Sequence, residues 1–212
     1  MSCFDVQIVS GYVRLDSDHR SHNEYLKLCS KLQNIGLPMS FFVQNLNDCW
    51  LYRHYQNQGV AIEESGNKDS MAYKIIMHEK SNWMHRASKA WSPKTLVWID
   101  AGIFHLQAIL PKHIIAFVEH LKKYPPQRIL SPSCKPLDME WDDRVIDWTF
   151  CGGVLAMPAL MSHWFQRQVE EHAKKDLTWE VNTWSKIVRK YPDNFQFYSA
   201  DHNEKMFTGI KS

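Results

Sequence analysis

The stretch that decides the fold class is Leu96-Val97-Trp98-Ile99-Asp100-Ala101-Gly102. Its first four residues belong to an unbroken apolar run of strand length, residues 95–99, which is typical of a central strand covered on both faces. A carboxylate, Asp100, follows at once, and the small residues Ala101 and Gly102 let a bulky ligand approach the backbone. We therefore expect Asp100 to bind a metal ion or a ligand hydroxyl, with a structural cap on the next turn as the alternative.

Strands and helices alternate outward from this stretch. Further strands are predicted at residues 6–13, 39–43, 60–62, 127–130 and 195–198, and within 145–157 with a break at Gly152-Gly153. Helices are predicted at residues 23–34, 48–56, 71–91, from 111 to the proline pair 125–126, 158–174 and 177–190, with polar loops at 63–69 and 131–143. The alternation predicts an α/β fold with a mostly parallel central sheet flanked by helices. In such sheets ligands bind beyond the carboxyl ends of the strands.

The composition is that of a globular protein. Of 212 residues, 44% are hydrophobic and 23% are charged, and only 8 are Gly and 9 are Pro. We expect one domain over residues 1–212, and the abrupt end of the chain leaves open that it belongs to a longer polypeptide. The net charge of +2 is small and evenly spread, which argues against nucleic acid as the main partner. No stretch approaches about 18 uninterrupted apolar residues, so no membrane span is expected.

The five cysteines are odd in number, widely spaced and form no C-x-x-C pair. They predict neither a disulfide framework nor a structural zinc site, and they favour a reducing, cytoplasmic location. Cys151 is interpreted as a small packed residue because no His–acid pair is placed to activate it. The sequence also lacks G-x-S-x-G, H-E-x-x-H, G-x-x-x-x-G-K-[ST] and G-x-G-x-x-G. Serine hydrolases, zincins, P-loop NTPases and dinucleotide oxidoreductases are therefore disfavoured.

Several short motifs occur in an order that matches one family of enzymes. They are Glu24-Tyr25-Leu26, a helix bearing Lys80, Trp98-Ile99-Asp100-Ala101-Gly102, Phe150-Cys151-Gly152-Gly153, Trp179-Glu180-Val181-Asn182 and Lys190-Tyr191-Pro192-Asp193-Asn194-Phe195. Taken together, the chain resembles nucleotide-sugar glycosyltransferases with the GT-A fold, in particular the bacterial HtrL/YibB-type glycosyltransferases. The resemblance implies a GT-A-like sheet with a Rossmann-like nucleotide-binding half. It also implies transfer of a sugar from a nucleoside-diphosphate sugar, UDP-linked, to a glycan or glycoconjugate hydroxyl, assisted by Mn²⁺ or Mg²⁺.

The resemblance assigns roles to particular residues. Asp100 is implied as a metal ligand and catalytic carboxylate, and His202 as the C-terminal histidine that completes the metal site. Glu180 is implied as the base or as the group that stabilises an oxocarbenium-like centre; otherwise it only complements the dipole of its helix. Substrate contacts are implied at Ser10, Gly11, Tyr12, Arg14, Lys80, Arg86, Gly102, Gly152, Gly153 and Trp179. Lys80 and Arg86 lie six residues apart on one predicted helix, so only one is expected to point inward and offset phosphate charge.

The chain departs from the family at the second acidic position of the usual Asp-x-Asp, which is Gly102. With Asp100 alone, metal binding is expected only with the nucleotide present, or not at all. A literal Asp-x-Asp occurs at Asp16-Ser17-Asp18, with His19 and His22 after it, and we interpret that stretch as a nucleotide-side or solvated loop. Two other functions stay open: a sugar- or nucleotide-binding module without catalysis, and a metal-dependent phosphoesterase that uses Asp16, Asp18, His19 and His202.

Nine Trp residues are an unusually high number for this length. Three lie in apolar stretches and are expected in the core: Trp98, Trp148 and Trp164. Four lie in polar surroundings and are candidates to stack on sugar rings: Trp83, Trp141, Trp179 and Trp184. Helix packing explains Trp184 equally well. Asp142 and Asp143, beside Trp141, are alternatives to Glu180 as the catalytic base or the group that stabilises the oxocarbenium-like centre.

Overall fold

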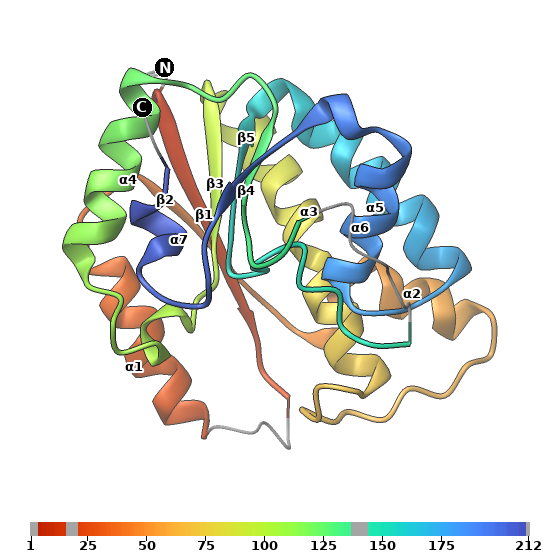
Figure 1. Cartoon of the computed structure of the whole chain (residues 1–212). Helices are drawn as coiled ribbons and strands as arrows, with labels where there is room; N and C mark the ends of the chain where they lie inside the picture. Colours follow the sequence, from red (N-terminus) through yellow and green to blue (C-terminus); the bar gives the residue numbers. More distant parts are fainter. Residues whose placement is uncertain (1–3, 16–20, 137–143, 211–212) are drawn as a thin grey trace.

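The structure is a computed structural model that describes residues 4–15, 21–136 and 144–210. Its centre is a six-stranded sheet made of β1 (Val6–Val13), β2 (Met39–Gln44), β3 (Thr95–Ile99), β4 (Ile129–Ser133), β5 (Val154–Pro158) and β6 (Phe195–Ser199). The spatial order is β2-β1-β3-β5-β4-β6 (Figure 1). β5 runs antiparallel to both of its neighbours, and the other paired strands are parallel. The prediction of a mostly parallel central sheet is confirmed.

Helices cover both faces of the sheet, as predicted. They are α1 (His22–Gln33), α2 (Trp50–Asn57), α3 (Met71–Trp91), α4 (Pro111–Lys123), α5 (Ser162–Lys175), α6 (Glu180–Lys190) and α7 (Lys205–Thr208). α1, α4 and α7 lie on one face, and α2, α3, α5 and α6 lie on the other (Figure 1). Among the described residues, none of the helices combines the length and the apolar character needed to cross a bilayer.

Local signals set the helix boundaries. The Ser21 hydroxyl accepts the backbone N–H of Glu24 at 3.3 Å, and the Glu24 carboxylate accepts the N–H of Ser21 at 2.8 Å, which closes the start of α1. Ser70 caps α3 by accepting the N–H of Tyr73 at 3.1 Å. α3 ends where Ser92 takes a left-handed φ of 46°. α3 and β3 have the bounds that the sequence predicts.

β3 lies between the two halves of the core. Leu96 and Trp98 pack with α3, α5 and α6, whereas Val97 and Ile99 pack with α4 on the opposite face. All five residues of the strand are buried, which confirms the expected central strand. Since β3 is fixed on both faces, the carboxylate that follows it stands on a rigid element.

The segment 60–62 forms no strand, contrary to the prediction. Gly59 has a φ of 77°, the left-handed conformation that glycine adopts readily. The chain then turns back, and the N–H of Val60 donates to the Tyr55 carbonyl at the end of α2 at 3.1 Å. A backbone group that closes a helix end cannot also pair in a sheet.

Two further predictions are corrected around β4 and β5. Residues 131–133 are not an exposed loop but the buried end of β4, because they pair with β6. Within 145–157 only β5 is a strand. Before it, Asp147 donates its N–H to the side-chain oxygen of Asn182 at 2.7 Å, which ties this segment to α6 rather than to the sheet. Both differences arise from contacts between distant parts of the chain.

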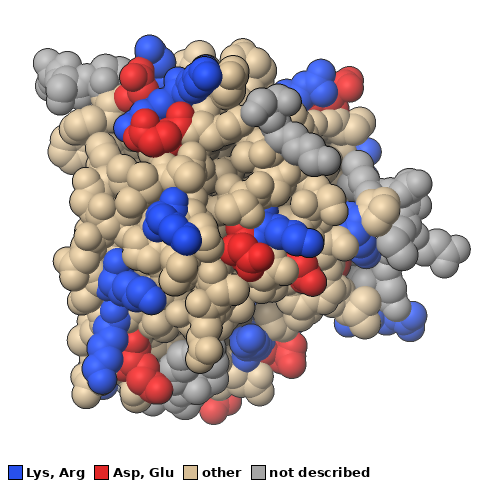
Figure 2. Space-filling view, turned by 60° about the vertical axis from the view of Figure 1, so that its left-hand side comes forward, with Lys and Arg blue, Asp and Glu red and all other residues tan. Residues whose placement is uncertain are grey.

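Charges of both signs are mixed on the surface. On the face shown in Figure 2, Lys and Arg side chains lie singly or in small groups among Asp and Glu side chains. This distribution accords with the net charge of +2. The described residues on this face form no extended basic patch of the kind that binds polyanions.

Candidate active site

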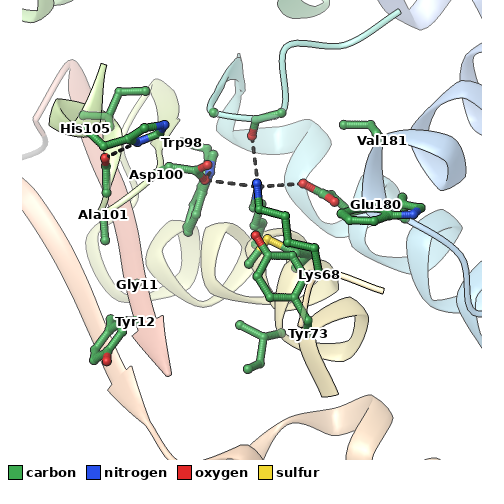
Figure 3. Close-up of a pocket in the computed structure, with 18 of the residues that line it drawn as sticks. Gly11, Tyr12, Lys68, Tyr73, Trp98, Asp100, Ala101, His105, Glu180 and Val181 are labelled. Carbon is green, nitrogen blue, oxygen red and sulfur yellow. Dashed lines mark hydrogen bonds and ion pairs between the residues drawn. The ribbon is translucent and has the colours of Figure 1, made fainter. Parts of the chain in front are cut away.

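A cleft of about 340 Å³ lies beyond the carboxyl ends of β1 and β3, beside α3 and the start of α6 (Figure 3). This is the place that the α/β fold favours for a ligand. The residues that line it come from the ends of strands and from helices that are far apart in the sequence. Its titratable or charged lining side chains include Lys68, Lys80, Asp100, His105, Glu180 and His202.

Lys80, from α3, joins two carboxylates in this cleft. Its ammonium lies 3.1 Å from Asp100 Oδ1 after β3 and 2.8 Å from Glu180 Oε1 in the first turn of α6. It also donates to the Gly152 carbonyl at 3.0 Å, so the three ammonium protons have three acceptors (Figure 3). Two carboxylates and one ammonium leave this triad with one net negative charge.

The Lys80 ammonium is almost completely buried. Burial alone would lower the pKa of Lys80, but the carboxylates of Asp100 and Glu180 outweigh it and hold that pKa above its ordinary value. The rings of Trp98 and Trp184 lie 5.7 and 5.8 Å from the ammonium and add cation–π attraction. Lys80 is therefore a fixed, charged group whose acceptors are protein atoms.

Asp100 is the more open of the two carboxylates. Its Oδ1 accepts the indole N–H of Trp98 at 2.7 Å in addition to the contact with Lys80. Its Oδ2 lies on the side of Gly153, where a Cβ would come within 3.6 Å of it. The side chain of Asp100 is 38% exposed, against 7% for Glu180. A ligand in the cleft can therefore reach Asp100 directly.

Packing leaves little or no room for a side chain at two glycines of the cleft. A Cβ on Gly11 would lie 2.4 Å from the Trp83 ring, which is buried beneath the cleft. A Cβ on Gly152 would lie 3.0 Å from both Glu180 Oε1 and Val181 Cγ1. Both glycines also line the cleft. Packing already accounts for them, and their contact with a substrate stays a prediction.

Aromatic side chains form much of the cleft wall. The rings of Tyr12 and Tyr25 are 5.2 Å apart, and those of Tyr73 and Trp179 are 6.0 Å apart. All four residues line the cleft. Trp148 lines it too and is 45% exposed, so the prediction that Trp148 belongs to the core is wrong. Its apolar sequence neighbours gave no sign of the turn that brings it to the surface.

The buried Trp residues support the cleft from below. Trp83 stacks on Trp98 at 5.8 Å, and both are almost fully buried, which confirms the core position of Trp98. Trp184 is also buried, within the packing of α6. Helix packing therefore accounts for Trp184, which is too deep to stack on a sugar. Trp164 is partly buried against the same core.

The structure brings most of the predicted site residues to the cleft. Those that line it are Gly11, Tyr12, Lys80, Asp100, Gly102, Gly152, Gly153, Trp179, Glu180 and His202. Ser10 is fully buried in β1, and Arg14 is exposed; neither is among the residues that line the cleft. Arg86 lies 4.9 Å from the Phe42 ring and lines a separate hollow. As expected, only Lys80 of the two helical cations points into the cleft.

Sequence reasoning missed Lys68, Tyr73 and His105, which also line the cleft. Burial raises the pKa of Tyr73 above its ordinary value. The His105 ring nitrogen Nδ1 lies 2.7 Å from the Gly102 carbonyl, so this nitrogen carries the proton and donates. Tyr73 could have been found from its spacing, because it precedes Lys80 by two helical turns and so shares its face of α3.

Asp100 and His202, the predicted metal ligands, both line the cleft but have different neighbours. His202 Nδ1 lies 3.5 Å from Cys134 Sγ, which is 2.9 Å from Cys151 Sγ. The hydrogen bond from the Cys151 thiol lowers the pKa of Cys134 to about 5. Among the described residues, the group of three side chains able to share a metal ion consists of these two cysteines and His202, and it does not include Asp100. The spacing of the cysteines in the sequence had argued against such a cluster.

Six predicted candidates lie outside the described residues. They are Asp16, Asp18, His19, Trp141, Asp142 and Asp143. The phosphoesterase hypothesis depends on the first three of them and stays a hypothesis.

No family model matches the chain, and no curated protein matches it. Among solved structures it is similar to a glycosyltransferase involved in the glycosylation of the major capsid of PBCV-1, with a TM-score of 0.48 and 11% identity over 93% of this chain and 82% of that chain. It is similar to CMP:2-keto-3-deoxy-manno-octonic acid synthetase complexed with CTP, with a TM-score of 0.48 and 8% identity over 92% and 90% of the two chains. Mouse xyloside xylosyltransferase 1 gives a TM-score of 0.44 and 10% identity over 91% and 84%. Likenesses at this level carry no argument about activity.

Proposed function

We propose that the chain is a glycosyltransferase that moves a sugar from a nucleoside-diphosphate sugar, UDP-linked, to a hydroxyl of a glycan or glycoconjugate. The observation that carries the proposal is the pair of carboxylates, Asp100 and Glu180, held by Lys80 in an aromatic-walled cleft at the end of a buried strand. When the bond to the diphosphate breaks, positive charge develops on the sugar ring. Two carboxylates that share one cation keep a net negative charge beside that ring. The motifs that resemble HtrL/YibB-type enzymes add sequence support.

Lys80 acts in this proposal as a positioning residue. Its three acceptors are protein atoms, and its ammonium holds the carboxylates of Asp100 and Glu180 in place. This differs from the role expected from the sequence, in which Lys80 offsets phosphate charge directly. We assign that role to Lys68, which lines the same cleft from the loop before α3.

Glu180 is the proposed catalytic carboxylate on the acceptor side. It is 5% exposed and begins α6. Lys80 holds its Oε1, and its other oxygen takes the proton of the acceptor hydroxyl or stabilises the oxocarbenium-like centre. A solvent deuterium isotope effect on the transfer rate distinguishes the two roles, because only a base takes the acceptor proton in the transition state.

The nucleotide half of the donor is proposed to lie on Tyr12 and Tyr25, at the end of β1. Their rings are close to each other and line the cleft. Aromatic faces stack on any nucleobase, so this pair supports nucleotide binding without selecting the base. The choice of UDP follows from the sequence resemblance.

Metal assistance is proposed with Asp100 as the protein ligand. Mn²⁺ and Mg²⁺ prefer oxygen ligands, and the open carboxylate of Asp100 supplies one. His202 fits such a cation less well, because its Nδ1 faces the Cys134 thiol. A bound cation would offset the charge of the diphosphate, whose oxygens would complete the coordination.

A thermal-shift assay joined to a transfer assay tests the proposal. UDP- and GDP-sugars are added, with and without Mn²⁺, to the wild-type chain, Asp100→Asn and Asp193→Asn. Asp193 is an exposed carboxylate outside the cleft lining and serves as the matched control. A donor at 100 times its dissociation constant adds about 2.7 kcal/mol of stability. We expect the shift and sugar transfer in the wild type and in Asp193→Asn, and the loss of both in Asp100→Asn.

Three results would contradict the proposal. If none of the nucleotide sugars raises the melting temperature of the wild-type chain, the chain has no donor site. A shift with neither transfer nor donor hydrolysis would indicate a binding module. Release of phosphate from simple esters, without any response to nucleotides, would indicate a phosphoesterase.

A further inference from the structure

Three neighbouring strands bring two thiols and an imidazole to one point. Cys134 follows β4, Cys151 lies just before β5, and His202 follows β6. In the order β5-β4-β6, the antiparallel direction of β5 places its start beside the carboxyl ends of the other two strands. Residues 17 and 68 positions apart in the chain therefore meet. Such spacings match no metal motif that can be read from the sequence.

The separations suit a tetrahedral zinc ion. With Zn–S bonds of about 2.3 Å and Zn–N bonds of about 2.1 Å, two sulfur ligands lie about 3.8 Å apart, and a sulfur and a nitrogen lie about 3.6 Å apart. Cys134 Sγ and His202 Nδ1 are already 3.5 Å apart. The two sulfurs are 2.9 Å apart and would separate by about 0.9 Å. All three ligand atoms lie within 4.8 Å of one another.

We propose that Cys134, Cys151 and His202 bind one Zn²⁺ ion. Thiolate and imidazole ligands suit zinc, whereas Mg²⁺ prefers oxygen. Three protein ligands leave a fourth position open, as in catalytic rather than structural zinc sites. Cys151 is fully buried, whereas the His202 side chain is 37% exposed and lines the cleft. The fourth position therefore faces the cleft, where water or an oxygen of a bound ligand can occupy it.

The backbone around the cluster holds its ligands in place. Cys151 donates its N–H to the Pro132 carbonyl at 3.0 Å, and Cys134 donates its N–H to the Trp148 carbonyl at 3.3 Å. The Trp148 ring meets the His202 ring edge-on, with centroids 4.8 Å apart. Because these contacts fix the backbone and the imidazole ring, binding requires little further ordering of the chain.

The zinc site is independent of the proposed glycosyl transfer. Zinc would place a positive charge on the wall of the cleft that also holds Asp100 and Glu180. It would also occupy His202, so a hard cation at Asp100 would have to do without that ligand. A nucleotide shift with no zinc binding, or zinc binding with no nucleotide shift, separates the failure of one proposal from the failure of the other.

Zinc and cobalt titrations of the reduced chain test the site. A thiol count of five on the denatured protein first establishes that every cysteine is reduced. The metal-free wild type is then titrated with Zn²⁺ against a chromophoric chelator, and with Co²⁺ while the absorption spectrum is recorded. We expect one zinc per chain, and cobalt bands of thiolate charge transfer with the strong visible absorption of four-coordinate Co²⁺.

Variants assign the ligands. In Cys134→Ser and His202→Asn, zinc affinity is expected to fall by more than about a hundredfold, because loss of a ligand weakens binding more than loss of an outer-shell partner. Cys49→Ser changes a buried cysteine outside the cluster and should bind zinc as the wild type does. His202 is partly exposed, so His202→Asn is the variant least prone to misfold.

The proposal is overturned if the reduced wild type binds no zinc, or binds it no more tightly than His202→Asn. A Cys134–Cys151 disulfide that persists under the reducing conditions would also overturn it. Circular dichroism of each variant shows that a loss of zinc is not a loss of fold.

Discussion

Two buried ionic groups contact α6, and they are built in opposite ways. In the cleft, one cation, Lys80, is shared by the carboxylates of Asp100 and Glu180. Outside the cleft lining, one carboxylate, Asp147, is shared by Lys135 at 2.7 Å and Arg189 at 3.2 Å. The first group carries excess negative charge and the second carries excess positive charge.

The carboxylates of the two groups also differ in burial and in how many hydrogen bonds they accept from the protein. The Asp147 side chain is completely buried, and its Oδ1 accepts both the N–H and the hydroxyl of Thr149 at 3.0 and 2.8 Å. The Asp100 side chain is 38% exposed and faces a cleft. A closed group of this kind stabilises the fold, whereas an open one is available to a ligand. The comparison therefore assigns structure to Asp147 and function to Asp100.

The largest effect is expected from Lys80→Met. Removing the shared cation leaves the buried Glu180 carboxylate beside that of Asp100 with no ammonium between them, so the free energy of unfolding should fall by about 3–5 kcal/mol. Denaturant titration measures this. The double variant with Glu180→Gln should recover part of the loss, and Lys94→Met, which breaks the exposed pair with Asp5, should change little. A Lys80→Met variant as stable as the wild type would show that Lys80 does not stabilise the two carboxylates.

The second effect concerns the closed group. Asp147→Asn removes the buried carboxylate that Lys135 and Arg189 share, and the free energy of unfolding should fall by about 2–3 kcal/mol. Donor binding, measured at a temperature where the variant is folded, should match the wild type. A variant that keeps its stability and loses donor binding would reverse the two assignments.

A third variant tests the floor beneath the cleft. In Gly11→Ala the new methyl group would overlap the Trp83 ring, which is held between Phe42 and Trp98 and cannot move aside. We expect a loss of roughly 1–3 kcal/mol in denaturant titration. Gly102→Ala is the matched control, since its nearest contact is 3.6 Å away. Equal stability of the two variants would show that the Trp83 ring can move to accommodate the new methyl group.

The smallest effect is a difference in pH dependence. Burial opposes ionisation of Asp147, but Lys135 and the other hydrogen-bond donors hold its pKa at about 2. Because this lies below the value of about 3.9 in the unfolded chain, its stabilisation is present above about pH 4 and is lost as the pH falls towards 2. The pKa of Lys80 is raised, so its stabilisation is kept below about pH 10.5 and is lost only above it.

Acid titration of stability checks this. Between about pH 4 and pH 2 the free energy of unfolding should fall more steeply in the wild type than in Asp147→Asn. Parallel curves for the two proteins in that window would show that Asp147 does not contribute through its charge.

The sequence predicted those features that depend on local pattern. The apolar run of β3 and the periodicity of α3 set their bounds, and the alternation of elements predicted the α/β sheet. The sheet predicts the position of the cleft, at the carboxyl ends of its strands. The motifs name Asp100 and Glu180 as candidate site residues. The predictions of β3, α3 and the sheet succeed because burial and helix capping act on residues close together in the chain, whereas the roles of Asp100 and Glu180 stay predictions.

Contacts between distant residues could not be predicted in this way. Lys80 and Glu180 are 100 positions apart, and Cys134 and His202 are 68 apart. Nothing near any of these residues in the sequence specifies its partner. Trp148 shows the same limit, since its apolar neighbours predicted burial and a turn exposes it in the cleft.

The most direct test of the account compares donor binding in Asp100→Asn and Asp147→Asn. Isothermal titration calorimetry with the nucleotide sugar that shifts the wild type, in the presence of Mn²⁺, gives a dissociation constant for each protein. The account predicts a constant at the wild-type value for Asp147→Asn and one raised by more than about tenfold for Asp100→Asn, because a charged contact with the ligand is lost. Equal dissociation constants for Asp100→Asn and the wild type would contradict the assignment of function to the open carboxylate.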